Sequence, residues 1–192
     1  MNQATENAVY QLLDRLGINY EVLHHEAAFT MEICQGIEQE LGAPICKNLF
    51  LCNRQQTDFY LLLMPGDKVF KTKYLSSQLG CARLSFAGEE FMRSLLHILP
   101  GSVSPMGLMN DTEGRVRLII DRDLLGKDTP TNGDTPTDGD TPADGDAVAS
   151  DTYFGCHPCV NTATLRLSMR EFLTKFLPAV GHEYTLVDLP AE

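Results

Sequence analysis

Two short apolar runs joined by a polar segment constrain the fold of this chain more than any other feature. The runs cover residues 48–52 and 59–64, and six polar residues separate them. Apolar runs of this length between polar residues are typical of buried strands, and a short polar connection joins such strands into an antiparallel hairpin. We therefore expect a hairpin at the centre of the fold.

The rest of the chain alternates between helical and strand-like patterns. Val9, Leu12, Leu13 and Leu16 share one helical face, and Thr5 before them suits an N-cap. With 192 residues and 43% hydrophobic composition, one core is expected, so residues 1–192 should form a single α/β domain with a mixed, largely antiparallel central sheet flanked by helices. The expected helices cover 5–16, 30–41, a stretch before Gly80, 89–96 and a stretch from Ser168; the expected strands cover 20–23, 83–86, 106–109, 116–120, 162–167 and 184–188.

A repeated acidic segment interrupts this pattern between residues 128 and 151. A hexapeptide beginning Asp-Thr-Pro occurs three times there, and seven of the chain's 26 acidic residues lie in the segment without any Lys or Arg. Because it lacks apolar side chains to offset the entropy of ordering, we expect a disordered insertion. Calcium binding is the alternative, although the EF-hand ligand spacing and its terminal Glu are missing. Outside it, 19 acidic residues face 15 Lys and Arg, which leaves room for a basic surface.

The cysteines and the apolar runs indicate a soluble protein of the cytoplasm. Six cysteines in 192 residues are too few for a disulfide scaffold, and no run reaches the roughly 20 apolar residues that span a bilayer. Cys156 and Cys159 have the C-x-x-C spacing of thiol oxidoreductases, but an extended segment follows them where that motif needs a helix. Zinc is disfavoured because no second ligand pair of suitable spacing exists. We expect reduced thiols, with redox chemistry as an alternative.

Three segments carry the polar groups of a candidate small-molecule pocket. Lys47 precedes a buried strand, where an ammonium can hold a phosphate or a ribose hydroxyl while Asn48 fixes its geometry. The 101–105 loop can offer backbone amides to an ester carbonyl or an oxyanion, since glycine permits close approach. His157, before a proline, can act in acid–base chemistry or serve as a structural histidine.

Several separated motifs, in order along the chain, resemble one known family. The resemblance is to the YbaK/ProX family of aminoacyl-tRNA editing domains, also called prolyl-tRNA synthetase associated domains, and most of all to its free-standing alanyl-tRNA(Pro) deacylase branch. It spans nearly everything except the repeats. The motifs are Lys47–Leu51, Leu62–Lys68, Leu79-Gly80, Arg83–Ala87, Pro100–Pro105, Asn110-Asp111, His157-Pro158 and Asn161–Thr164.

The resemblance implies hydrolysis of the ester that joins a wrong amino acid, alanine in the first instance, to the 3′ adenosine of tRNA(Pro), without metal, cofactor or covalent nucleophile. Lys47 and His157 would be the catalytic residues, and a positioned water would attack the ester. A small apolar pocket would exclude larger side chains. The residues implied in substrate binding are Phe29, Thr30, Met31, Asn48, Gly101, Ser102, Val103, Ser104, Pro105, Gly155, Pro158 and Asn161. Cys156, before the His-Pro pair, departs from the family pattern and leaves cysteine, serine or threonine as alternative amino acids.

A basic surface would meet the acceptor end of tRNA(Pro). Lys68, Lys71, Lys73 and Arg83 supply cations for phosphate contacts, although a scattered solvated surface is the simpler interpretation. We expect no anticodon-binding or synthetase catalytic region in these 192 residues, so tRNA identity must be read from the acceptor stem or supplied by a partner synthetase. The candidate partners are prolyl-tRNA synthetase and an elongation factor, and no membrane is expected. A module that binds tRNA or a synthetase without catalysis is the remaining alternative.

Overall fold

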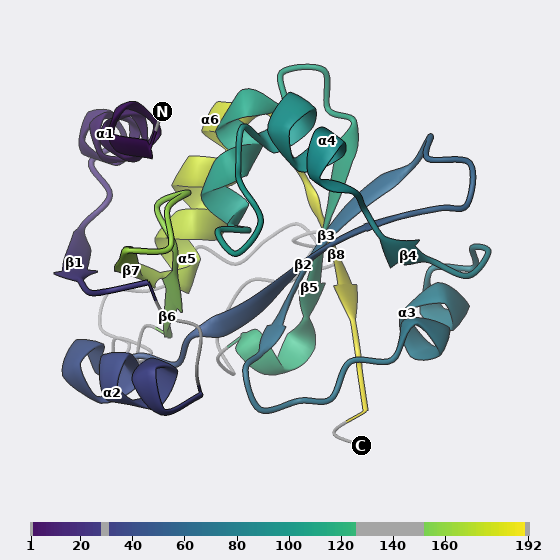
Figure 1. Cartoon of the computed structure of the whole chain (residues 1–192), viewed down its shortest axis with the longest axis horizontal. Helices are drawn as coiled ribbons and strands as arrows, with labels where there is room; N and C mark the ends of the chain where they lie inside the picture. The colour runs from purple at the N-terminus through teal and green to yellow at the C-terminus, as the bar shows by residue number, and fades with distance from the viewer. Residues whose placement is uncertain (1, 28–30, 126–151, 191–192) are drawn as a thin grey trace, which may run out of the picture.

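The computed structural model describes residues 2–27, 31–125 and 152–190, which form two sheets with helices around them (Figure 1). The expected disordered insertion at 128–151 lies outside the described residues. One sheet has the strand order β1-β7-β6 and the other β4-β2-β3-β5-β8. The strands are β1 (Tyr20–His24), β2 (Cys46–Cys52), β3 (Phe59–Pro65), β4 (Ser85–Phe86), β5 (Val116–Asp121), β6 (Tyr153–Cys156), β7 (Ala163–Ser168) and β8 (Tyr184–Val187).

The predicted hairpin is confirmed and forms the centre of the larger sheet. β2 and β3 pair antiparallel with Lys47 opposite Met64 and Cys52 opposite Phe59. β5 then pairs parallel with β3, so β3 has neighbours on both edges and its first six residues are buried. A strand covered on both edges and both faces needs a continuous apolar sequence, which explains why this run lacks polar alternation.

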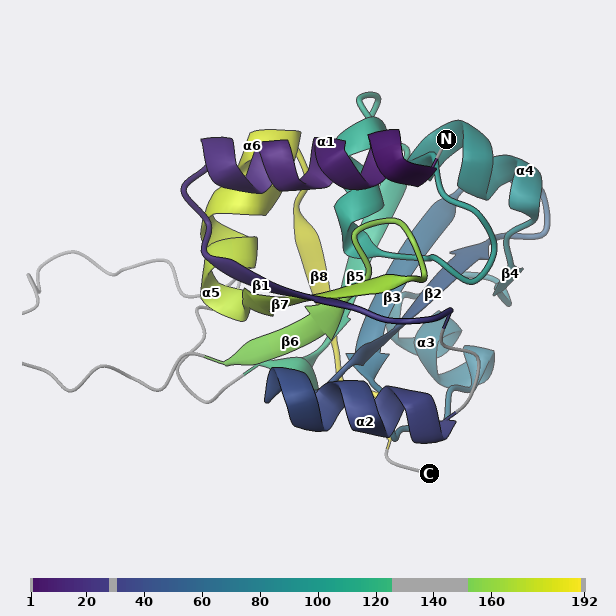
Figure 2. The same ribbon diagram turned by 60° about the vertical axis from the view of Figure 1, so that its left-hand side comes forward.

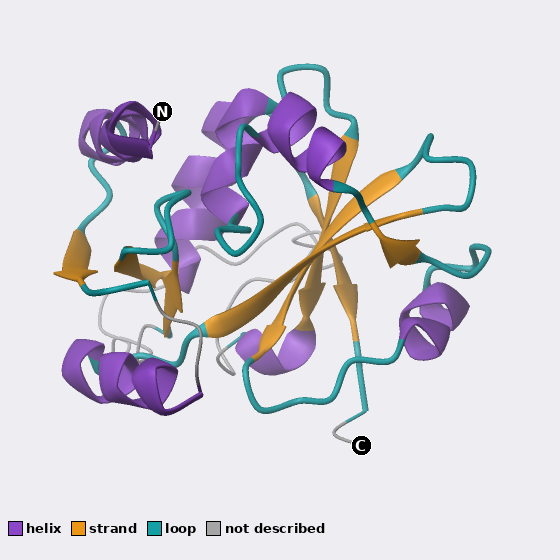
Figure 3. Ribbon diagram, in the orientation of Figure 1, coloured by secondary structure: helices purple, strands orange, loops and turns teal. Residues whose placement is uncertain are grey.

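Helices cover the sheets on several sides, as the colouring of Figure 3 shows. In Figure 2, α1 lies on one side of the three-stranded sheet and α2 lies on the other. The helical segments are α1 (Asn2–Arg15), α2 (Met31–Leu41), α3 (Thr72–Gln78), α4 (Glu89–Phe91), η1 (Met92–Leu96), η2 (Pro105–Asn110), η3 (Arg122–Leu124), α5 (Met169–Glu171), η4 (Phe172–Phe176) and α6 (Leu177–Val180). None of the described helices has the length and apolar character needed to cross a membrane.

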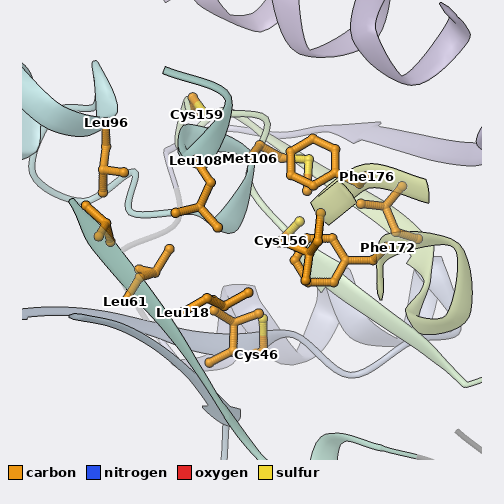
Figure 4. Packing of buried hydrophobic residues seen from close by; sticks show 14 of the residues in the cluster. Cys46, Leu61, Leu96, Met106, Leu108, Leu118, Cys156, Cys159, Phe172 and Phe176 are labelled. Carbon is orange, nitrogen blue, oxygen red and sulfur yellow. The ribbon is translucent and has the colours of Figure 1, made fainter. Parts of the chain in front are cut away.

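One apolar cluster packs between the two sheets and fixes their relation. Figure 4 shows Cys46 of β2 and Cys156 of β6 in the same cluster as Phe172 and Phe176 of η4. The rings of Phe154 and Phe172 meet edge to face, with centroids 5.3 Å apart. The start of β2 and the end of β6 are thereby held together, although more than 100 residues of sequence separate them.

A backbone contact at the edge of this cluster joins the two sheets directly. The amide of Gly155 donates to the carbonyl of Pro44 at 2.7 Å, and Ile45 and Gly155 form an isolated parallel bridge. A Cβ atom at position 155 would lie 3.0 Å from Cγ1 of Ile45, which is tighter than ordinary packing. Glycine at 155 therefore permits the approach that brings the His157 turn beside Lys47.

Two expectations differ from the structure. The expected strand at 106–109 is part of η2, because Pro105 begins that helix and the Ser104 hydroxyl caps it by accepting from the amide of Met106 at 3.1 Å. The expected single central sheet is two sheets, since β1, β7 and β6 form a separate three-stranded sheet. The predicted α/β class is confirmed, with four antiparallel and two parallel strand pairings.

Candidate active site

A cavity of about 840 Å³ brings the three predicted segments together. Lys47 and Asn48 line it from β2, Gly101 and Val103 line it from the loop before η2, and His157 lines it from the turn after β6. Apolar walls come from both sheets, among them Phe50 of β2 and Phe154 of β6, and from Ile45 just before β2. The sequence therefore predicted the principal polar groups of one concave site from segments far apart along the chain.

Lys47 is half-buried at the rim of this cavity. Its Nζ donates to the backbone carbonyl of Lys68 at 2.6 Å. In the part of the chain that the structure describes, no carboxylate forms an ion pair with it. An ammonium with one backbone partner retains donors for a ligand oxygen, because lysine carries three N–H groups.

Asn48 is oriented by its neighbour Cys46. The side-chain amide of Asn48 donates to the Cys46 carbonyl at 3.4 Å, and the Cys46 thiol lies 3.4 Å from two acceptors, the Asn48 side-chain oxygen and the Gly155 carbonyl. Burial raises the pKa of Cys46 to about 12, although hydrogen bonds oppose that shift. The thiol therefore stays protonated and can donate to the Asn48 side chain, which lines the cavity.

The loop before η2 is tied to the His157 turn. The Ser104 hydroxyl donates to the backbone carbonyl of His157, and Ser104 is completely buried. Gly101 has φ +83°, a left-handed conformation that favours glycine. Ser102, Ser104 and Pro105 are buried behind the lining, so Gly101 and Val103 are the members of this loop that a ligand can reach.

His157 is half-buried and its ring has a defined proton position. Nδ1 lies 2.9 Å from the carbonyl oxygen of Ala163, which can only accept, so Nδ1 carries the proton. Burial lowers the pKa of His157 and the neighbouring His25 lowers it further, while the Ala163 carbonyl opposes both. The two imidazole rings lie 6.3 Å apart. A neutral ring in this tautomer presents Nε2 as an acceptor.

The other residues predicted to bind substrate lie around the cavity or outside the described residues. Gly155 and Pro158 are buried and Asn161 is half-buried, and none of the three lines the cavity. Gly155 contributes indirectly, because its close approach to Ile45 holds the His157 turn next to the start of β2. Phe29 and Thr30 lie outside the described residues, and Met31 begins α2.

The prediction that Lys68 contributes to an exposed basic surface is wrong. Lys68 is 6% exposed, and its Nζ contacts Asp121 at 2.8 Å, Asp123 at 2.7 Å and the Leu189 carbonyl at 2.7 Å. Burial alone would lower the pKa of Lys68, but its bonds to the two carboxylates raise it above the usual value. Sequence could not reveal this, because the partner Asp121 is 53 residues away. Lys71, Lys73 and Arg83 are exposed, as expected.

The C-x-x-C thiols lack the environment that redox chemistry needs. Cys156 and Cys159 are free and buried. Burial raises the pKa of Cys156 well above its ordinary value, and burial raises that of Cys159 to about 12. Reactive cysteines need a lowered pKa and access to solvent. Within the described residues, no three His, Cys, Asp or Glu side chains form a metal-binding group.

Three acidic residues of the cavity lining are not among the site residues predicted from the sequence. Glu38, Asp67 and Asp123 contribute to the lining from three separate elements. Glu38 also accepts from the amide of Ile45 at 2.8 Å and so fixes the entry to β2. Asp67 lies within the Leu62–Lys68 motif of the family resemblance, which is the sequence signal that covers this part of the lining.

The two-sheet fold and its cavity define a class of small α/β domain, and sequence similarity to a known family identifies that class. Residues 25–131 match the family of the aminoacyl-tRNA editing domain. The chain belongs to this family, as its motifs predicted.

Its relatives resemble it over nearly their whole length. The prolyl-tRNA editing protein ProX of Acetoanaerobium sticklandii is 29% identical over 189 residues, covering 98% of this chain and 100% of the relative. The prolyl-tRNA synthetase associated domain-containing protein 1 of Bos taurus is 30% identical over 178 residues, covering 92% and 90%. A crystal structure of a protein proposed to be a trans-editing enzyme for prolyl tRNA synthetase has the same fold, with a TM-score of 0.63, 19% identity and coverage of 97% and 98%.

Proposed function

We propose that this protein hydrolyses the ester bond of mischarged tRNA(Pro) and that alanine is the amino acid it removes. The observation that carries the proposal is the convergence of Lys47, the Gly101–Val103 loop and His157 on one cavity. The names of the relatives, which refer to prolyl-tRNA editing and to prolyl-tRNA synthetase, support tRNA(Pro) as the partner. The tRNA identity would be read from the acceptor stem or supplied by the synthetase.

The residues of the cavity suit ester hydrolysis by a positioned water. Lys47 would donate to an oxygen of the terminal adenosine and hold it at the rim. His157, neutral with its proton on Nδ1, would accept a hydrogen bond from water through Nε2 and orient it toward the ester carbon. Water adds to the carbonyl, the bond to the ribose oxygen breaks, and the free amino acid and the tRNA hydroxyl are released.

The lining also favours a small apolar amino acid. Ile45 and Val103 offer apolar contact to a methyl group. A pocket of this kind rejects larger side chains by steric exclusion, which is needed because one methylene changes binding by only about 1–3 kcal/mol. Cysteine and serine are close to alanine in size, so their removal is the alternative outcome within the same chemistry.

The test is deacylation of Ala-, Cys-, Ser- and Pro-tRNA(Pro) by the wild type and by Lys47→Ala. We expect rapid loss of alanine, and a decrease of roughly 100-fold in the variant, the size seen when one positioned donor is removed. Lys175→Ala is the control, because Nζ of Lys175 also donates to a backbone carbonyl, that of Gly17 at 2.9 Å, and Lys175, which pairs with Glu171, does not line the cavity. Its activity should equal that of the wild type.

Three other results are informative. Removal of cysteine or serine in place of alanine would keep the reaction and change the specificity. Equal losses in Lys47→Ala and Lys175→Ala would contradict the assigned role of Lys47. Binding of tRNA without turnover of any ester would favour the non-catalytic module, for which the same cavity would serve as a recognition site.

A further inference from the structure

A second concave surface continues from the cavity, beginning at Lys47 and Leu49 of β2 and extending toward α3 and β4. It is a groove of about 720 Å³ between α3 and β4. Lys47, Leu49 and Phe86 line both the groove and the cavity, so the two are continuous. The remaining groove residues are Phe70, Lys71, Thr72, Lys73 and Arg83.

Phe86 has an unusual environment for a large apolar side chain. It is 62% exposed, and among the described residues Val69, at 57%, is the other large hydrophobic side chain with such exposure. Phe86 lies on β4, the edge strand, where its backbone pairs with Leu51. Its ring meets that of Phe70 edge-on, at 6.3 Å between centroids. The contact with Phe70 fixes the ring while most of it remains open to a ligand.

The charges of the groove have one sign. Its lining includes Lys47, Lys71, Lys73 and Arg83 and no carboxylate, in a chain whose net charge is −11. Lys71 and Lys73 lie 5.8 and 5.5 Å from the ring of Tyr74. Over the described ranges, none of the four cations forms an ion pair with a carboxylate. Their charges are therefore available to a polyanion.

Exposed aromatic rings between unpaired cations are the features by which proteins hold single-stranded nucleic acid. The bases stack on the rings and the phosphates lie against Lys and Arg, with little dependence on sequence. We propose that this groove binds the unpaired 3′ end of the RNA substrate, with one base stacked on Phe86 and the backbone phosphates on Lys71, Lys73 and Arg83. The inference rests on the proposed function, because it directs the terminal ester past Lys47 into the cavity.

The experiment measures binding of uncharged RNA, so that it does not depend on hydrolysis. The probe is a fluorescein-labelled RNA hairpin with four unpaired nucleotides at its 3′ end, and the same hairpin with a blunt end is the reference. Fluorescence anisotropy gives the dissociation constants. We expect Phe86→Ala to weaken binding of the overhang hairpin by roughly 5- to 100-fold, the range for loss of one stacked base.

Matched variants separate stacking from general surface effects. Val69→Ala removes a comparably exposed apolar side chain that does not line the groove, and it should leave the dissociation constant within about twofold. Phe86→Trp keeps a stacking surface and should retain binding. Lys71→Glu should weaken binding, whereas Arg170→Glu, an exposed charge on α5, should not.

The outcomes distinguish failure of the groove from failure of the proposed function. Equal affinity of Phe86→Ala and wild type for the overhang hairpin would overturn the groove assignment, even if deacylation proceeds. Phe86-dependent binding without deacylation would keep the groove and reject the enzyme. Tighter binding of a polyglutamate peptide than of the RNA, with the same dependence on Phe86, would make the groove a protein-docking surface and also overturn the assignment.

Discussion

The cavity and the groove share Lys47, Leu49 and Phe86, yet their electrostatics differ. The cavity combines Lys47 with Glu38, Asp67 and Asp123, whereas the groove has four cations and no carboxylate. A lining of both signs repels part of a polyanion, while a lining of cations attracts all of it. Under the proposed function, Lys47 therefore marks the point where the RNA backbone ends and the amino acid begins.

The largest expected effect concerns Lys68, a cation that belongs to neither surface. Lys68→Ala leaves Asp121, which is fully buried, with the backbone amide of Asp123 but without a cation to balance its charge, and we expect a loss of about 3–5 kcal/mol in the free energy of unfolding. Urea denaturation measures it. Lys71→Ala, in the groove, should change stability by less than about 0.5 kcal/mol. Equal stability of the two variants would show that Lys68 is a surface cation after all.

The salt dependence of RNA binding should come from the groove alone. With three phosphate contacts on a single strand, the dissociation constant should rise about 20-fold between 50 and 200 mM salt. Arg83→Gln should flatten the logarithmic slope by about 0.7, as expected for one lost contact. The deacylation rate at saturating substrate should not follow salt. A rate that follows salt as steeply as binding does would contradict the division between the two surfaces.

A smaller effect is expected at Gly155, whose contact with the Pro44–Ile45 segment joins the two sheets that form the cavity. In Gly155→Ala the new Cβ would lie 3.0 Å from Ile45, so Ile45 must move and stability should fall by about 1–2 kcal/mol. Deacylation should fall as well, since the His157 turn shifts relative to Lys47, while RNA binding in the groove should persist. Gly36→Ala is the control, because nothing lies within 4 Å of its added Cβ and alanine favours the α2 helix.

The smallest effect is the pH dependence of stability that comes from His157. Its pKa is lowered in the folded protein, chiefly by burial, so the unfolded chain takes up a proton first as the pH falls below about 6.5. Stability should therefore decrease on acidification through that window and level off below the folded pKa. Urea midpoints at several pH values, in the wild type and in His157→Asn, measure it. An identical slope in both proteins would falsify this assignment.

Local sequence patterns predicted most of the elements, although β6 was not expected and the expected strand at 106–109 is part of η2. Contacts between distant residues decided the rest. The β2–β3 hairpin follows from two apolar runs, and the Ser168 cap, which accepts from the amide of Glu171 at 3.2 Å, follows from capping-box spacing. The burial of Lys68 depends on Asp121 and Leu189, which no local pattern connects to it. The sequence pattern likewise predicts an ordinary strand residue at Phe86. Its exposure could not be predicted, because it depends on β4 being an edge strand of the sheet.

The hydrogen bond from Ser104 to the His157 turn positions the 101–105 loop without using the His157 side chain. Its acceptor is the backbone carbonyl of His157, and the imidazole ring takes no part in it. Any residue at position 157 supplies that carbonyl, so the tether survives a change of side chain. Position 157 can therefore be varied, by mutation or by design, to change what the cavity does to a bound ester while the loop at 101–105 keeps its place.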